Sequence, residues 1–327
     1  MSWNDFFIFT VVPFVYNESV RIPTTYSPEN NVDINLCKFI DMTCCSINVF
    51  EKPICMLVSE RVFQNCYSGK DGPGCINFNC SQTGSEGQMV LTRTCASNCW
   101  ATNDEQFLRS RVGLTTNYRN DFHLTSIVSC GMKPGYTVQQ GEKIKGVITL
   151  MGGMQTTSSF NVSGSLVQMY ILNNDSSEAS GRYVSLSDNY CTENGLHIHV
   201  VNGHATYRNT IINGNVEDGS SYSIIFASDA TLRFTESVFA NNRGSAPLFS
   251  IGSDNSAITL LMCYVQTDMD TQQASILTPT DNNGMQIPLL HTALCNAENA
   301  YIAATICSKE VHIKVNGIVF FFGLCCF

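Results

Sequence analysis

The 327-residue chain is poor in charge, and basic residues are the scarcer kind. Only 14% of its residues are charged, and 18 Lys and Arg against 27 Asp and Glu give a formal net charge of −9. Binding to nucleic acid or to an anionic membrane surface by counterion release needs a basic stripe, so neither partner is expected. Because 44% of the residues are hydrophobic, the sequence predicts a buried core and not a disordered chain.

Long hydrophobic runs and helical patterns are also lacking. Residues 6–16 have the length of a signal peptide but no basic residue before them and no clear small-residue cleavage site after them. The apolar run at residues 317–327 is about half as long as a membrane span, so it is either a last buried strand or part of an anchor. No long stretch shows a 3.6-residue apolar stripe with caps, so helices are not expected.

Cysteine is abundant but unevenly placed. Ten of the 16 cysteines lie at or before Cys130 and four at or after Cys295. Two readings stay open, namely a disulfide framework near the two ends, as in an oxidising compartment, or free thiols packed as small hydrophobes inside a repeat protein. The candidate glycosylation sites of a secreted chain are the four Asn-x-Ser/Thr sequons at Asn17, Asn79, Asn161 and Asn174.

Three successive segments between residues 196 and 268 can be laid over one another. Each has two short stretches of alternating apolar and polar residues around a small polar turn, and the equivalent residues Ile211, Val238 and Tyr264 are 27 and 26 positions apart. Neither half of a unit could bury its apolar face alone, so stacking of the units is the physical solution. Asparagine at the strand ends suits a corner, because it tolerates left-handed backbone and its amide can pair in a ladder.

The predicted fold is therefore all-β, a single-stranded right-handed parallel β-helix, with Tyr207, Phe234 and Leu260 stacked inward in register. A β-sandwich is the alternative, since it gives the same alternation without a fixed register. We expect the repeat domain at residues 30–290, an N-terminal cap at 1–29 and a C-terminal cap or truncated hydrophobic anchor at 291–327. Caps are expected because an open solenoid end invites aggregation, and the runs Phe6–Tyr16 and Ile318–Phe322 would cover the terminal rungs.

Two short motifs carry a family resemblance. The run from Phe63 to Ile76 has an F-x-N corner followed by a glycine-rich turn, and Phe239 to Asn242 repeats the first half. These motifs resemble the repeat module of polymorphic-membrane-protein-type β-helices, and the composition is similar to that of the Cys- and Asn-rich β-helix proteins on the surface of parasitic protozoa. Gly72-Pro73-Gly74-Cys75 stands in place of the usual glycine pair. The resemblance implies an adhesin or display scaffold at the cell surface.

Pectin-degrading enzymes share the β-helix, so a carbohydrate-active reading is the sharpest enzyme hypothesis. Hydrolases of that group carry paired carboxylates, whereas the nearest segments here, around His204 and Asn209, lack them. A lyase needs acidic calcium ligands and a basic residue. Asp268, Asp270 and Asp281 are acidic, but they have no matching basic residues nearby. A Cys–His pair of Cys130 with His123 is a weaker candidate. No catalytic residue is assigned.

Histidines, cysteines and aromatic residues are the candidates for metal sites and binding surfaces. His197 and His199 alternate with apolar residues, so both rings are expected to face outward, with His204 nearby. The three could chelate zinc or copper, but outward polar residues of a coil are the favoured interpretation. The cysteine spacings are not those of zinc knuckles, so neither metal nor cofactor is expected. Outward aromatic residues such as Trp100 and Tyr118 suit a sugar-stacking strip.

The sequence thus predicts a non-enzymatic, extracellular or cell-surface β-helix that binds a glycan or protein ligand in an adhesin-like way. The alternatives are a carbohydrate-active β-helix enzyme, either a polysaccharide lyase or a glycoside hydrolase, and a decayed family copy without function. Carboxylates or an Arg converging in a groove on one face of the stack would favour the enzyme. Membrane contact through the C-terminal apolar segment stays open.

Overall fold

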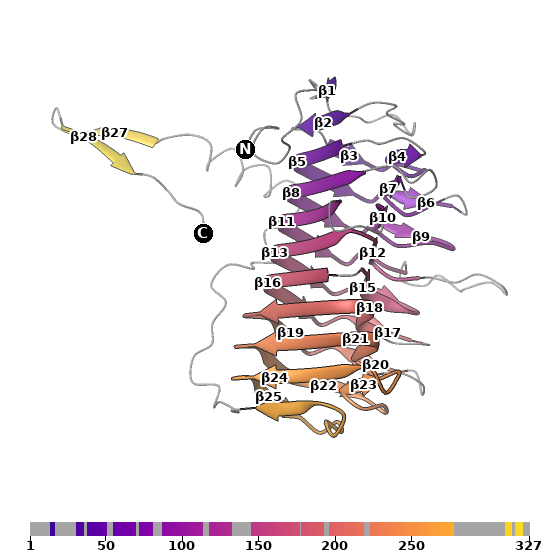
Figure 1. Ribbon diagram of the computed structural model, residues 1–327. Coiled ribbons are helices and arrows are strands. Elements are labelled where there is room, and N and C mark those ends of the chain that lie inside the picture. Colours follow the sequence, from indigo (N-terminus) through magenta and orange to yellow (C-terminus); the bar gives the residue numbers. More distant parts are fainter. Residues whose placement is uncertain are drawn as a thin grey trace.

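The computed structural model shows a parallel β-helix of about seven turns, in which strands stack along one axis (Figure 1). The structure describes residues 14–16, 31–277, 311–315 and 318–322. Interruptions within the long range fall at residues 36–37, 51–54, 70–71, 81–86, 114–117, 133–144, 177, 193–195 and 219–222. The predicted fold is confirmed. Because every strand pair of the stack is parallel, the β-sandwich alternative is excluded.

Each full turn passes through a first face, a second face, a narrow side and a third face. The first face contains β1 (Phe14–Tyr16), β2 (Val32–Asn35), β24 (Ala257–Leu261), β26 (Ser275–Leu277) and parts of the longer strands β5 (Cys55–Gln64), β8 (Gln88–Ser97), β11 (Arg119–Val128), β13 (Met154–Ser163), β16 (Glu178–Ser187), β18 (Leu196–Arg208) and β21 (Ile225–Thr235). The second face contains β3 (Lys38–Ile40), the second halves of β5 to β16, β19 (Ile211–Asn213), β22 (Val238–Gly244) and β25 (Tyr264–Thr267).

The narrow side and the third face complete the turn. The narrow side contains β6 (Tyr67–Ser68), β9 (Trp100–Ala101), β14 (Leu166–Val167), β17 (Tyr190–Cys191), β20 (Val216–Glu217) and the end of β22. The third face contains β4 (Ile47–Phe50), β7 (Ile76–Asn79), β10 (Leu108–Arg111), β12 (Ile148–Met151), β15 (Tyr170–Asp175), the first halves of β18 and β21, and β23 (Phe249–Ile251).

Two corners are built from columns of residues in the left-handed backbone region. Between the first and second faces the column is Glu60, Arg93, Leu124, Ser159, Tyr183, Asn209, Glu236 and Met262. Between the second face and the narrow side it is Asp41, Asn65, Asn98, Ser129, Gly164, Asp188, Gly214 and Asn241. All sixteen φ values lie between 48° and 66°. In the second column, Asn, Asp and Gly occupy every position but Ser129, which confirms the predicted corner role of asparagine, since these residues adopt that conformation at low cost.

Inward side chains form one continuous core along the stack. Tyr207 pairs with Phe234 and Phe234 with Leu260 on successive rungs, and all three are buried, as predicted from the repeat. The Tyr207 and Phe234 rings stack with centroids 5.4 Å apart, and near the other end the Phe39 and Phe63 rings stack at 4.9 Å. Each rung therefore buries its apolar residues against the equivalent residues of its neighbours.

At the inner corner beside the narrow side, the buried residues change from apolar and cysteine to polar along the axis. The residues that follow the second left-handed column are Met42, Cys66, Cys99, Cys130, Ser165, Asn189, Asn215 and Asn242, and all are buried. Asn189 donates from Nδ2 to Asn215 Oδ1 (3.0 Å), and Asn215 donates likewise to Asn242 Oδ1 (3.1 Å). This asparagine ladder confirms the predicted amide pairing.

The structure describes only parts of the two predicted caps. β1, within the predicted N-terminal cap, pairs with β2 and so extends the first face. Ile318–Phe322 forms β28, which pairs antiparallel with β27 (Val311–Val315). Residues 1–13 and 278–310 lie outside the described residues, so the domain boundaries at 29 and 290 stay predictions. No helix long and apolar enough to cross a membrane occurs in the described ranges.

Candidate functional site

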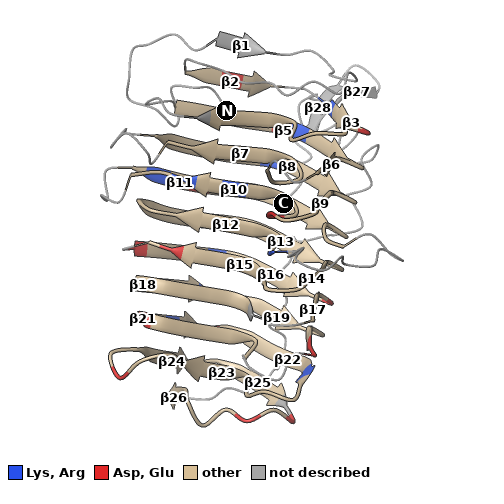
Figure 2. Ribbon diagram, turned by 90° about the vertical axis from the view of Figure 1, so that its right-hand side faces the viewer, with Lys and Arg blue, Asp and Glu red and all other residues tan. Residues whose placement is uncertain are grey.

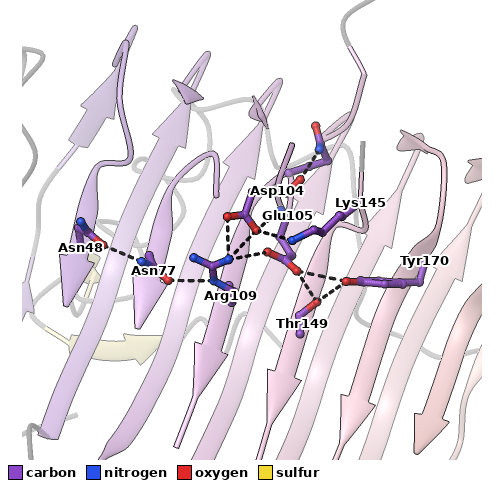
Figure 3. Close-up of polar contacts among 9 residues, drawn as sticks. Asn48, Asn77, Asp104, Glu105, Arg109, Lys145, Thr149 and Tyr170 are labelled. Atoms are coloured by element: carbon purple, nitrogen blue, oxygen red, sulfur yellow. Dashed lines mark hydrogen bonds and ion pairs between the residues drawn. The ribbon is translucent and has the colours of Figure 1, made fainter. Parts of the chain in front are cut away.

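A polar network covers the upper part of the third face. The outward positions of neighbouring strands carry Asn48, Asn77, Arg109 and Thr149, and a loop at residues 102–107 lies over them. Arg109 donates from Nε to Asn77 Oδ1 (3.1 Å), and Asn77 donates from Nδ2 to Asn48 Oδ1 (2.7 Å), so the three side chains form a row (Figure 3). Most of the ribbon of the stack is neither basic nor acidic (Figure 2).

Two adjacent carboxyl groups lie at the centre of the network. Asp104 pairs with Arg109 (Nη1 to Oδ2, 2.7 Å) and with Lys145 (Nζ to Oδ1, 3.5 Å). Glu105 Oε1 accepts hydrogen bonds from Thr149 Oγ1 (2.9 Å) and from Tyr170 OH (3.1 Å). The loop thereby joins rungs that are far apart in the sequence.

The two carboxyl groups differ in acidity. Burial, reinforced by the hydrogen bond to Asp104 and its negative charge, raises the pKa of Glu105 to about 7. Burial also opposes ionisation of Asp104, but the hydrogen bond from Glu105 and the charges of Arg109 and Lys145 outweigh it, and the pKa of Asp104 is lowered. Below about pH 7 the pair therefore holds one proton, and Glu105 is the group that titrates.

This pair has the residue types of a glycosidase but not its geometry. Carboxyl groups that cleave a glycosidic bond stand about 5–9.5 Å apart across an open groove. Asp104 and Glu105 are instead adjacent in the chain, the Glu105 main-chain N–H donates to Asp104 Oδ1 (3.0 Å), and the exposed fractions of the two residues are 5% and 2%. The arrangement therefore explains how the loop is fixed to the third face, and it differs from a carboxyl pair spaced across a groove.

Glu105→Gln should stabilise the protein at about pH 8 by roughly 1–2 kcal/mol, because it removes a carboxylate that is expensive to ionise under burial. A raised pKa means that the folded wild type loses stability as pH rises through about 7, so the gain should shrink at about pH 5, where Glu105 is protonated. The amide oxygen can still accept from Thr149 and Tyr170. Urea unfolding at both pH values measures the effect.

Glu60→Gln is the matched control, because Glu60 pairs with Arg93 at the surface (3.0 Å). We expect it to change the free energy of unfolding by less than about 1 kcal/mol at either pH. If Glu105→Gln instead lowers the free energy of unfolding by the same amount at both pH values, Glu105 is ionised in the folded protein and the prediction is wrong.

A groove of about 470 Å³ lies at the corner beside the narrow side. Its aromatic part is formed by Tyr67 and Trp100, which project from β6 and β9 on adjacent rungs and stack with centroids 4.1 Å apart. Met132 and Gly131 continue the lining on the next rung. Both rings are only half-buried, because the outward position of a strand points away from the core.

Polar side chains of the left-handed column form the other wall of the groove. Asn98 donates from Nδ2 to Asn65 Oδ1 (3.4 Å), and Asn65 donates from Nδ2 to Asp41 Oδ1 (3.0 Å). Asp41, Asn65, Asn98 and Ser129 are exposed and line the groove with the aromatic pair. The groove thus combines flat apolar surface with a row of amide and carboxylate groups that donate and accept hydrogen bonds.

The structure separates the two aromatic residues named from the sequence. Trp100 lies in the groove, whereas Tyr118 packs against the core and does not belong to an outward strip. Tyr67 was missed, although its spacing from Asn65 equals that of Trp100 from Asn98. The matching Asn-Cys-aromatic triplets at residues 65–67 and 98–100 were the signal that could have found it.

The expectation that both histidines of residues 197–199 face outward is wrong. His197 is completely buried, and only His199 is half-exposed on the third face. His197 is the second residue of β18, in a column whose neighbouring members are Ile171 and Ile224, and at this corner the consecutive residues His197 and Ile198 are both buried. His204 is exposed and contacts the Thr231 hydroxyl. No shared metal site of the three follows.

Other candidate residues are dispersed. Cys130 is buried in the inner corner, while His123 is on the first face. Asp268 and Asp270 are exposed after β25, and Asp281 lies outside the described residues. Among the sequons, Asn79, Asn161 and Asn174 are buried in strands, which disfavours them as glycan acceptors in the folded chain, and Asn17 lies outside the described residues.

Most cysteines serve as small core residues. Ten of those in the described ranges carry free thiols, nine of them buried, and Cys95 is disulfide-bonded. Within those ranges one group of side chains has metal-ligating geometry, formed by Cys66, Cys75 and Cys99. The linear spacing of these three residues gave no sign of it.

Comparisons with known proteins add no identity. No family model matches the chain, and no curated protein is significantly similar to it. The class defined by the fold is that of the parallel β-helix proteins.

Proposed function

We propose that this chain is a non-catalytic carbohydrate-binding β-helix, displayed at a cell surface or secreted, whose ligand lies in the groove beside Tyr67 and Trp100. The stacked aromatic pair next to a row of amides is the observation that carries the proposal. A sugar ring offers an apolar face to an aromatic side chain and hydroxyl groups to amides and carboxylates, and this wall provides both kinds of partner.

The long stack supports the same proposal. A rigid solenoid fixes successive rungs at about 4.8 Å, so the corner presents equivalent positions at regular spacing along the axis. An extended chain with its own repeat, such as a polysaccharide, suits such a surface. The F-x-N motif that resembles surface β-helix families includes Asn65, which lies in the groove wall.

Trp100→Ala should weaken glycan binding by about fivefold or more, taking as a guide the about 1–3 kcal/mol that stacking of one nucleobase on an aromatic ring contributes. Asn98→Gly should weaken it by a smaller factor, because it removes one amide while glycine keeps the left-handed backbone. Binding of the purified chain to an immobilised glycan panel, followed by calorimetry with the best ligand, measures both effects.

Tyr190→Ala is the matched control, because Tyr190 projects from β17 on the same narrow side but outside the groove. It should bind as well as the wild type. Retention of full affinity by both Trp100→Ala and Tyr67→Ala would place the ligand elsewhere. Failure of the wild type to bind any glycan would contradict the proposal and favour a chain without this activity.

A carbohydrate-active enzyme is the second candidate, favoured by one observation, the adjacent buried carboxyl groups of Asp104 and Glu105, whose pKa values shift in opposite directions. Incubation with polygalacturonate, glycosaminoglycans and chitin, with and without calcium, tests it through new reducing ends or unsaturated products. Sustained product release that is lost in Glu105→Gln would replace the binding proposal with an enzymatic one.

A further inference from the structure

Three cysteine thiols meet inside the solenoid, behind the aromatic groove. The Sγ atoms of Cys66, Cys75 and Cys99 all lie within 4.8 Å of one another, and the three side chains are completely buried. Cys66 and Cys99 directly precede Tyr67 and Trp100 in the chain. Because consecutive residues of a strand point to opposite sides, the thiols face the core while the rings face the groove.

The narrow side of the solenoid explains why the sulfur atoms converge. Cys66 and Cys99 occupy the inner corner on adjacent rungs, whereas Cys75 belongs to the column that precedes the third face. The strand between those two corners, β6, is only two residues long, so the columns face each other at close range. Cys66 also donates from Sγ to Phe39 O (3.4 Å) and Cys99 to Ser97 O (3.3 Å), which fixes their orientation.

The distances fit a three-coordinate metal ion. With metal–sulfur bonds of about 2.3 Å, a trigonal site separates its sulfur atoms by about 4 Å, so the thiols need to move by less than about 1 Å. The group contains three sulfur donors and no oxygen or nitrogen. Soft thiolates of this kind select Cu(I), while structural zinc takes four ligands.

A buried hydroxyl group lies next to the thiols. Ser46 is completely buried, and its hydroxyl group lies next to the Cys66 thiol. A thiolate at Cys66 would accept a hydrogen bond from this hydroxyl, as second-shell partners commonly do for metal ligands.

We propose that Cys66, Cys75 and Cys99 form a trigonal thiolate site for Cu(I). Binding replaces the protons of the ligand thiols, so up to three protons pass to solvent for each ion bound and no electron is transferred. Burial raises the pKa of the Cys75 and Cys99 thiols, so the metal-free site is protonated near neutral pH and its affinity falls as pH falls. The inference is independent of glycan binding.

The test is anaerobic refolding of the full chain with a Cu(I)–acetonitrile complex, followed by challenge with a Cu(I) chelator. We expect one retained ion per chain, luminescence typical of a solvent-shielded Cu(I)–thiolate, and a sulfur-only first shell by X-ray absorption. Each of Cys66→Ser, Cys75→Ser and Cys99→Ser should lower the affinity by more than the roughly 10–100-fold that a second-shell partner is worth.

These substitutions suit the fold, because Ser165 occupies the same column as Cys66 and Cys99, and Ser46 the same column as Cys75. Cys191→Ala is the control, since Cys191 is equally buried away from the triad and Ala101 occupies its column on β9. It should retain the ion. Loss of the ion to the chelator from the folded wild type, equal retention by the triple Ser variant, or preferential uptake of Zn(II) would overturn the proposal.

Discussion

Asn215→Ala is expected to lower the free energy of unfolding by about 3–5 kcal/mol, because it breaks a buried ladder at its centre. Asn215 Oδ1 accepts from both the main-chain N (3.1 Å) and Nδ2 (3.0 Å) of Asn189, and Asn215 Nδ2 donates to Leu186 O (2.8 Å). The substitution leaves the Asn189 main-chain N–H and the Leu186 carbonyl without these partners in the core. Each such group costs about 1–3 kcal/mol.

Asn241→Gly is the control for this prediction. Asn241 lies one residue before the ladder, in the exposed left-handed column where Gly164 and Gly214 already occur. It should change stability by less than about 1 kcal/mol, since glycine adopts the same backbone conformation. Urea denaturation with a common m-value measures both variants. A loss below about 1 kcal/mol in Asn215→Ala would mean that the ladder fills space without stabilising the stack.

The regular half of the stack was predictable because its turns are nearly equal in length. Between β18 and β25, equivalent residues recur every 26 or 27 positions, so Tyr207, Phe234 and Leu260 could be aligned from the sequence. In the N-terminal half, insertions at the corners change the spacing: Asn65 bonds a residue 24 positions earlier and Asn98 one 33 positions earlier. The repeat is present there, but its period is not constant.

The functional side chains were harder to predict because solenoid neighbours are one rung apart and not a fixed number of residues apart. Cys75 meets Cys66 and Cys99 only through the stacking of rungs across the narrow side. Glu105 reaches Thr149 and Tyr170 from a loop that has no repeat pattern. By contrast, the corner position of Asn65 follows from backbone preference and was predicted, although the groove beside it was not.

His197 was misplaced for a related reason. Strict alternation of sides holds within a strand, and it fails at a corner, where two consecutive residues turn inward. The buried ring occupies a position that its neighbouring rungs fill with isoleucine, so its effect on stability can be measured by substitution.

His197→Ile should remove the part of the acid sensitivity of the fold that comes from this buried ring. Burial lowers the pKa of His197 to about 4, with the contact between Nε2 and Val216 O (3.3 Å) opposing the shift only in part. Since the unfolded chain binds the proton below about pH 6.5 and the folded chain does not, the free energy of unfolding falls as pH falls through this window. From about pH 7.5 to about pH 5, His197 alone should remove about 2 kcal/mol of stability.

The variant should therefore be at least as stable as the wild type at about pH 5 and lose less stability on acidification. Isoleucine suits the site because Ile171 and Ile224 flank it in the same buried column. His204→Ala, which removes an exposed ring from the same strand, should keep the acid sensitivity of the wild type. Urea unfolding at the two pH values separates them, and an unchanged pH dependence in His197→Ile would show that the ring is protonated inside the folded core.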